Sequence, residues 1–178
     1  MKIEALTLVM VCMIPVSCSA QKFNNTPVDK LDTGRYLGKW YEIARFDHSF
    51  ERDMHYAKAT YTLNDDGTIK VVNAGIRKGK FKQSVGKAKL TARPGLLRVS
   101  FFGPFYSDYR VLMVADDYSY ALVGSGSRDY LWILSRTPSL PDSILNEVLM
   151  EAMVRGYDPA NLIWVQQKAP EYFTTVEN

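Results

Sequence analysis

The sequence predicts an all-β fold: an eight-stranded antiparallel up-and-down β-barrel with one C-terminal α-helix packed outside and a short final strand. Three observations predict it. Eight segments between residues 38 and 136 alternate apolar and polar residues. Short turns rich in Asp, Gly and Pro separate these segments. Only one later segment, residues 139–156, carries apolar residues at helical spacing.

The expected strands follow one another through tight connections, as in an antiparallel meander. The Asp66-Gly67 pair between two alternating runs is a strong hairpin signal. Eight such strands can close around one small ligand, and closure removes the exposed edges of the sheet. The expected strands are residues 38–46, 55–63, 68–75, 80–91, 96–102, 107–115, 118–124 and 129–136.

One amphipathic helix follows the last barrel strand. Ser139 is its expected N-cap, Pro141 falls in its first turn, and Gly156 is its expected end. Its apolar residues lie on one face only, so we expect the helix to pack against the outside of the barrel. Residues 162–166 then predict a short last strand.

The first twenty residues predict an export signal, because a short apolar run follows Lys2 and ends in small residues. Cleavage before Cys18 would leave a cysteine that is acylated, for example with palmitate, and anchors the protein to a membrane. Ordinary cleavage after Ala20 is the alternative. The expected parts are a signal peptide at 1–17 (or 1–20), a tether at 18–31, a barrel domain at 32–168 and a loose tail at 169–178. Asp32 is the expected cap of a short helical turn before the first strand.

Composition argues against several function classes. A net charge of +3 is too small to indicate nucleic-acid binding. Both cysteines, Cys12 and Cys18, lie in the leader, so we expect a mature domain without cysteines or disulfides. The two histidines and the lack of nucleophile, phosphate-loop or metalloprotease motifs predict no catalytic site, no metal site and no cofactor. The histidines are interpreted as loop residues, and the charges near them as a solvated rim. These residues are His48, His55, Arg45, Arg52, Arg77, Asp47, Glu51 and Asp53. The alternative for the three arginines is that they favour an anionic head group at the mouth of the barrel.

Three short motifs resemble the signatures of the lipocalin family. They are Gly38-Lys39-Trp40 on the first strand, Ser107-Asp108-Tyr109 near the sixth, and Arg136 at the end of the eighth. Serine replaces the usual threonine in the second. The stretches WYEIARFDHSFER, SFFGPFY and DYLWILSRTP are similar to the bacterial lipocalins anchored in the outer membrane, whose animal relative is apolipoprotein D. The resemblance covers nearly the whole mature chain.

The resemblance implies that Trp40 plugs one end of the barrel and that the Arg136 guanidinium packs across its indole, with Gly38 allowing close approach. It also implies a ligand in the barrel cavity. Alternation by two predicts the lining, mostly apolar with a few polar groups. The expected ligand-binding residues are Ala44, Phe46, Ala57, Ala59, Tyr61, Val71, Asn73, Val99, Phe101, Tyr109, Val111 and Met113.

The function expected from the resemblance is non-covalent transport or storage of a fatty acid or lysophospholipid at the bacterial envelope. The protein would be membrane-bound through Cys18 and either monomeric or homodimeric. Two alternatives stay open from the residues: a lipocalin-like barrel enzyme or haem-handling protein, and a structural envelope protein whose barrel is filled.

Overall fold

The structure, a computed structural model, describes residues 22–167. The predicted signal peptide, Cys18 and the predicted tail at 169–178 lie outside the described residues. No helix between residues 22 and 167 is long and apolar enough to cross a membrane.

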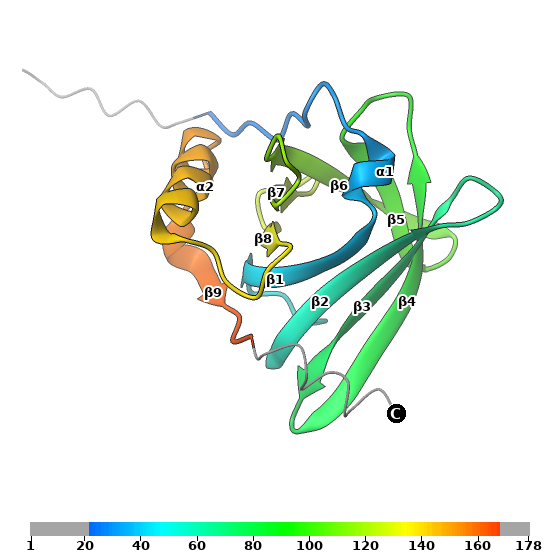
Figure 1. Cartoon of the computed structure of the whole chain (residues 1–178), viewed down its shortest axis with the longest axis horizontal. Helices are drawn as coiled ribbons and strands as arrows, with labels where there is room; N and C mark the ends of the chain where they lie inside the picture. Colours follow the sequence, from blue (N-terminus) through cyan, green and yellow to red (C-terminus); the bar gives the residue numbers. More distant parts are fainter. Residues whose placement is uncertain (1–21, 168–178) are drawn as a thin grey trace, which may run out of the picture.

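Eight antiparallel strands close into a barrel, as predicted (Figure 1). The sheet order runs from β2 through β8 to β1, and β1 pairs again with β2, which closes the ring. A ninth strand, β9 (Leu162–Trp164), pairs with β1 outside the ring. The barrel strands are β1 (Gly38–Phe46), β2 (Met54–Leu63), β3 (Ile69–Arg77), β4 (Lys80–Leu90), β5 (Leu96–Phe102), β6 (Phe105–Val114), β7 (Tyr120–Gly124) and β8 (Leu131–Ser135).

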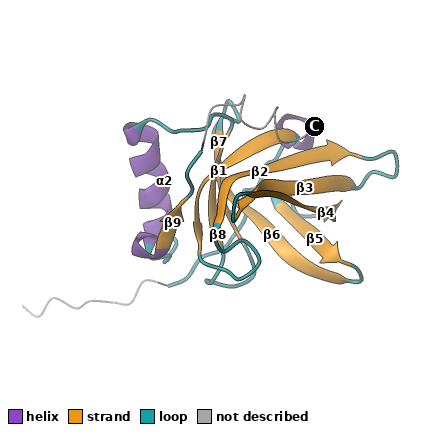
Figure 2. Ribbon diagram, turned by 90° about the horizontal axis from the view of Figure 1, so that it is seen from below, coloured by secondary structure: helices purple, strands orange, loops and turns teal. Residues whose placement is uncertain are grey.

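The helix α2 (Asp142–Val154) lies beside the barrel on the side of β9 (Figure 2). The predicted cap at Ser139 is wrong: Pro141 occupies the N-cap position and makes no side-chain cap, while the Ser139 carbonyl accepts a bond from Thr137. The predicted end is confirmed. Gly156 has φ +85°, and the N–H groups of Gly156 and Tyr157 return to the last turn of the helix.

The two ends of the barrel follow from the connectivity. The loops 64–68, 91–95 and 115–119 lie at the end crossed by α1 (Thr33–Tyr36), which we call the closed end. The loops 47–53, 78–79, 103–104 and 125–130 lie at the other end, which we call the open end. The α1 helix is capped by the Asp32 carboxylate, which accepts a bond from the Arg35 N–H at 3.1 Å, as predicted.

Residues 22–31, the described part of the predicted tether, lie along the barrel wall. The Asn24 N–H donates to the Arg155 carbonyl, and the Val28 N–H donates to the Val111 carbonyl, both at 2.9 Å. The Asp32 N–H donates to the Tyr118 hydroxyl at 2.7 Å. The segment therefore runs from the end of the molecule where α2 finishes to the closed end.

Two hydrophobic clusters divide the core, one inside the ring and one beneath α2. The inner cluster contains Tyr36, Trp40, Tyr61, Ile69, Val71, Ala88, Leu97, Val111, Ala121, Val123 and Leu134. The helix-side cluster contains Tyr41, Ile43, Ala44, Phe46, Leu112, Leu122, Leu131, Ile133, Val148, Ala152, Tyr157 and Leu162.

Candidate functional site

The closed end is stoppered by Trp40 and Arg136, as the resemblance implies. Trp40 is fully buried, and the Arg136 Cζ lies 3.7 Å from its ring centroid. Arg136 also donates to the carbonyls of Lys39 at 2.7 Å and Leu37 at 2.9 Å. Gly38 has φ +93°, a conformation that side chains rarely adopt, so the backbone itself requires glycine in this signature.

Three tyrosines in or beside the inner cluster lie near Trp40, and their hydroxyl groups form hydrogen bonds with one another. The Tyr109 hydroxyl lies 2.7 Å from that of Tyr36 and 2.9 Å from that of Tyr61. Burial raises the pKa of all three hydroxyls above their ordinary value, so they stay neutral hydrogen-bonding groups. The preceding residue, Asp108, points to the other face of β6 and pairs with Arg98 and Arg110.

Seven of the twelve predicted lining residues belong to the inside of the ring. Tyr61, Val71 and Val111 are buried in the inner cluster, and Ala59, Val99, Phe101 and Tyr109 pack against it. Asn73 is half-buried and lies opposite Ala59 in the register of β2 and β3. Ala57 is buried beside the bulge in β2, where its carbonyl accepts a bond from Gln167 at 2.8 Å.

Three predicted lining residues are on the wrong side of the wall: Ala44, Phe46 and Met113. Ala44 and Phe46 belong to the helix-side cluster, and Met113 packs against it. The cause is a β-bulge in each strand, between Glu42 and Ala44 in β1 and between Val111 and Met113 in β6. An extra residue in a bulge shifts the inward parity of the strand by one.

The bulge in β1 turns Arg45 into the barrel in place of Ala44 and Phe46. Arg45 is 2% exposed, and its Nη1 donates to Glu42 Oε1 at 2.5 Å. Its Nη2 donates to the Glu51 carbonyl at 2.6 Å, while the Glu51 carboxylate accepts a bond from Trp132 Nε1 at 3.1 Å. Glu42, Arg45, Glu51, His48 and Trp132 form what we call the inner polar cluster.

The interpretation of Arg45 and Glu51 as solvated residues is therefore wrong, since both are buried. His48 lies in the 47–53 loop, as predicted, but is buried as well, whereas His55 lies in β2 and not in a loop. Two features of the sequence point to this burial: the arginine stands between apolar residues in β1, and the loop after it carries a glutamate and a histidine. Alternation alone misses the cluster, because the bulge is not visible in the sequence pattern. Arg52, in contrast, is exposed and pairs with Asp47 at 2.8 Å, as a rim residue would.

The inner polar cluster carries one permanent cation for two carboxyl groups. Burial, reinforced by the nearby Glu51, raises the pKa of Glu42 to about 8. Burial also raises the pKa of Glu51 and lowers that of His48 to about 4. At neutral pH, His48 is therefore neutral, and burial favours the protonated form of Glu42.

The cluster also holds polar atoms that have no protein partner. Arg45 Nε and both His48 ring nitrogens are buried without a hydrogen bond. Elsewhere in residues 22–167, the same holds for Ser100 Oγ, Tyr157 Oη and Gln167 Oε1. His48 Nε2 lies 3.4 Å from Glu51 Oε2, outside hydrogen-bond geometry. Such groups gain free energy from a partner that enters the barrel.

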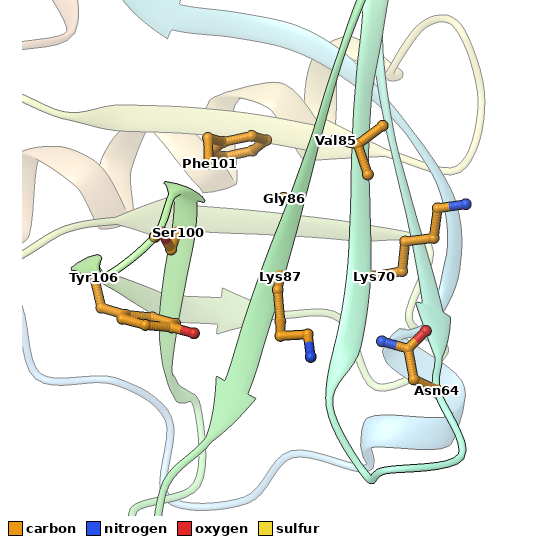
Figure 3. Close-up of a pocket in the computed structure, with 9 residues that line it drawn as sticks. Asn64, Lys70, Val85, Gly86, Lys87, Ser100, Phe101 and Tyr106 are labelled. Carbon is orange, nitrogen blue, oxygen red and sulfur yellow. The ribbon is translucent and has the colours of Figure 1, made fainter.

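A separate depression of about 480 Å³ lies on the outer wall, over β3, β4 and β5 (Figure 3). The side chains of Lys70, Val85 and Lys87 line it, on the sheet face opposite the buried Val71 and Ala88. Lys87 pairs with Asp66 at 3.0 Å. Of the predicted ligand-binding residues, only Phe101 borders this depression.

No group of three or more His, Cys, Asp or Glu residues within 22–167 is arranged to hold a metal ion.

Comparison with known proteins matches this architecture. Residues 31–167 match the lipocalin-like domain family. The chain is 51% identical over 146 residues to outer membrane lipoprotein Blc of Escherichia coli K12, covering 80% of this chain and 82% of that protein. It is 37% identical over 123 residues to apolipoprotein D of Rattus norvegicus, covering 64% and 65%.

Among solved structures, insecticyanin from the tobacco hornworm Manduca sexta superimposes with a TM-score of 0.69 at 20% identity. The superposition covers 84% of this chain and 87% of insecticyanin, and it supports the fold. The closed eight-stranded ring, the Trp40–Arg136 stopper and the sequence matches all agree: this chain belongs to the lipocalin family.

Proposed function

We propose that the protein binds a single-chain amphiphile, a fatty acid or lysophospholipid, non-covalently inside the barrel at the bacterial cell envelope. One observation carries the proposal. The inside of the barrel has an apolar middle and, toward the open end, the inner polar cluster with unpartnered buried atoms. A single-chain amphiphile has the same two parts.

The apolar part of the ligand would contact side chains that are small or aliphatic. These are Ala59, Val71, Val99 and Val111, with Phe101 beside them. Each methylene that leaves water contributes about 0.8 kcal/mol, so two more carbons should tighten binding by roughly tenfold until the barrel is filled. Reversible burial of this kind needs no catalytic group.

The polar part would contact the inner polar cluster. A ligand carboxylate or phosphate can accept a bond from Arg45 Nε, and the neutral His48 ring can donate one more hydrogen bond. An anionic head group would also balance the Arg45 charge when Glu42 is protonated. The tyrosine hydroxyls at the closed end already bond to each other and are less available.

The cellular place of this binding is proposed from the relatives. Proteins named outer membrane lipoprotein are up to 51% identical to this chain, and Cys18 follows a leader of the lipoprotein type. Acylation of Cys18 would hold the barrel at the outer membrane, where free fatty acids and lysophospholipids are released.

Native mass spectrometry of protein purified without detergent should show one bound lipid per chain. Tryptophan emission then follows a titration with a brominated fatty acid in a Trp164→Phe variant, which removes the exposed tryptophan of β9. Saturable quenching of Trp132 is expected, because its ring packs against the inner cluster. No bound lipid together with no saturable quenching would contradict the proposal.

A matched pair of variants separates the inside of the barrel from its outside. Val99→Phe places a larger ring among the inner side chains and should weaken fatty-acid binding about tenfold or more. Val85→Phe makes the same change on the exposed face of β4 and should leave binding unchanged. Equal effects of both variants would place the ligand elsewhere.

A further inference from the structure

The open end of the barrel carries the most exposed aromatic side chains of the described chain. Phe102 and Phe105 flank the β5–β6 turn and are 83% and 78% exposed. Phe50, in the β1–β2 loop, is 54% exposed and stacks on His48 with ring centroids 4.0 Å apart. Aromatic rings held in water at the rim of an apolar interior indicate a surface that contacts something apolar.

Charge is distributed unequally between the two ends. The open end carries more cations than exposed acids. The cations are Arg52, Arg77, Lys78, Lys80 and Arg128, and the exposed acids are Asp47, Asp53 and Asp129. The closed-end turns instead expose four acidic residues, Asp65, Asp66, Asp116 and Asp117, against one cation, Arg93. The closed end also exposes Leu63, which precedes the acidic 64–68 turn, and Leu90, which precedes the 91–95 turn that carries Arg93. Within residues 22–167, only the open end therefore combines exposed aromatic side chains with an excess of cations.

The start of the described chain lies at this same end. The Arg128 guanidinium lies 5.2 Å from the Phe23 ring centroid, and Asn25 Nδ2 donates to the Ser125 carbonyl at 3.0 Å. Both partners are in the β7–β8 loop at the open end, and Figure 2 shows the described chain beginning on the side opposite α1. Cys18 lies four positions before Lys22, a reach of at most about 14 Å.

We propose that the open end docks on an anionic phospholipid bilayer, so that the barrel mouth faces the membrane and Phe50, Phe102 and Phe105 enter its interface. The argument from the tether rests on the proposed acylation of Cys18. The argument from the exposed aromatic and basic residues of the open end does not depend on that acylation. A barrel held this way exchanges its amphiphile with the bilayer without passing the ligand through water.

The orientation is tested on the full chain in vesicles of phosphatidylethanolamine and phosphatidylglycerol. An environment-sensitive thiol label is placed at Phe102→Cys at the open end or at Ala92→Cys, an exposed residue in the 91–95 loop at the closed end. Brominated lipids should quench the label at position 102 several-fold more than the label at 92. Equal quenching, or stronger quenching at 92, would overturn the proposal.

Docking is separated from anchoring with a Cys18→Ser chain, which carries no acyl group at that position. This chain should still float with the anionic vesicles, and Phe102→Ser with Phe105→Ser should reduce the bound fraction about tenfold. The matched control Met150→Ser with Met153→Ser removes exposed apolar residues of α2 and should change little. Equal losses of the vesicle-bound fraction in the two double variants would overturn docking. So would a Cys18→Ser chain that does not float with vesicles and instead self-associates through Phe102 and Phe105. The mass of the first mature residue tests the acyl anchor separately.

Discussion

The two ends of the barrel treat buried polar groups in opposite ways. At the closed end, Arg136 lies on Trp40 and donates to several backbone carbonyls, and the three tyrosine hydroxyls bond to one another. In the inner polar cluster, one arginine serves two buried carboxyl groups, and polar atoms remain without partners. This difference supports the proposal that the open half of the barrel accepts the ligand head group, while the closed end stabilises the fold.

The largest effect is expected at the stopper. Trp40→Ala should lower the free energy of unfolding by about 3–5 kcal/mol, because it leaves a large cavity and removes the surface on which Arg136 stacks. Urea unfolding at pH 7 measures the loss. Trp164→Ala, on the exposed face of β9, is the matched control and should lose far less. Similar losses of unfolding free energy in Trp40→Ala and Trp164→Ala would show that Trp40 is not the main stabilising residue of the closed end.

The next effect concerns the only cation of the inner polar cluster. Arg45→Met should lower the free energy of unfolding by about 3 kcal/mol near pH 7, because it leaves buried carboxyl groups without their cation. The same variant should weaken binding of a fatty acid. Arg52→Met breaks an exposed pair with Asp47 and should change neither quantity measurably.

A smaller effect is expected in the pH dependence of stability. The raised pKa of Glu42 means that its stabilising contribution is complete below the unfolded-state pKa near 4.5 and is lost as the pH rises to about 8. The pKa of His48 is lowered to about 4, so its contribution to stability increases as the pH rises to about 6.5 and does not change above that pH. Between pH 6.5 and 8, wild-type stability should therefore fall relative to that of Glu42→Gln. Parallel curves for the two proteins would show that Glu42 is ionised throughout.

The smallest effect is expected from one hydroxyl at the closed end. Tyr109→Phe removes the group that bonds to both Tyr36 and Tyr61, and should lower the free energy of unfolding by about 1–2 kcal/mol. Fatty-acid affinity should stay within about twofold, because this hydroxyl is occupied by protein partners. A loss of affinity larger than the loss of stability would assign Tyr109 to the ligand head group.

The same comparison explains what the sequence could predict. Alternation placed β1 and β5 at their observed bounds, and it placed Tyr61, Val71, Val99 and Val111 inside, since regular pairing preserves a period of two. It failed at Ala44, Phe46 and Met113, which follow bulges. A bulge depends on the pairing of neighbouring strands, so the pattern of one strand does not reveal it.

The inner polar cluster was missed for a related reason. Arg45 reaches the interior only through the bulge in β1, and Glu51 and His48 come from a loop that folds back over the barrel. Charged residues in loops are ordinarily solvated, so sequence alone assigns them to the rim. The roles of Trp40 and Arg136 were predicted from the resemblance of their motifs to the lipocalin signatures rather than from alternation, and Arg136 lies just after the end of β8.

The most direct test of the account is a crystal structure of the protein with a fatty acid brominated near the middle of its chain. The anomalous signal of bromine locates the chain without reference to the protein. We expect the peak inside the ring, close to Val99 and Phe101, with the carboxylate directed toward Arg45. A peak in the outer depression beside Lys87, or no ordered peak at a saturating concentration, would contradict it.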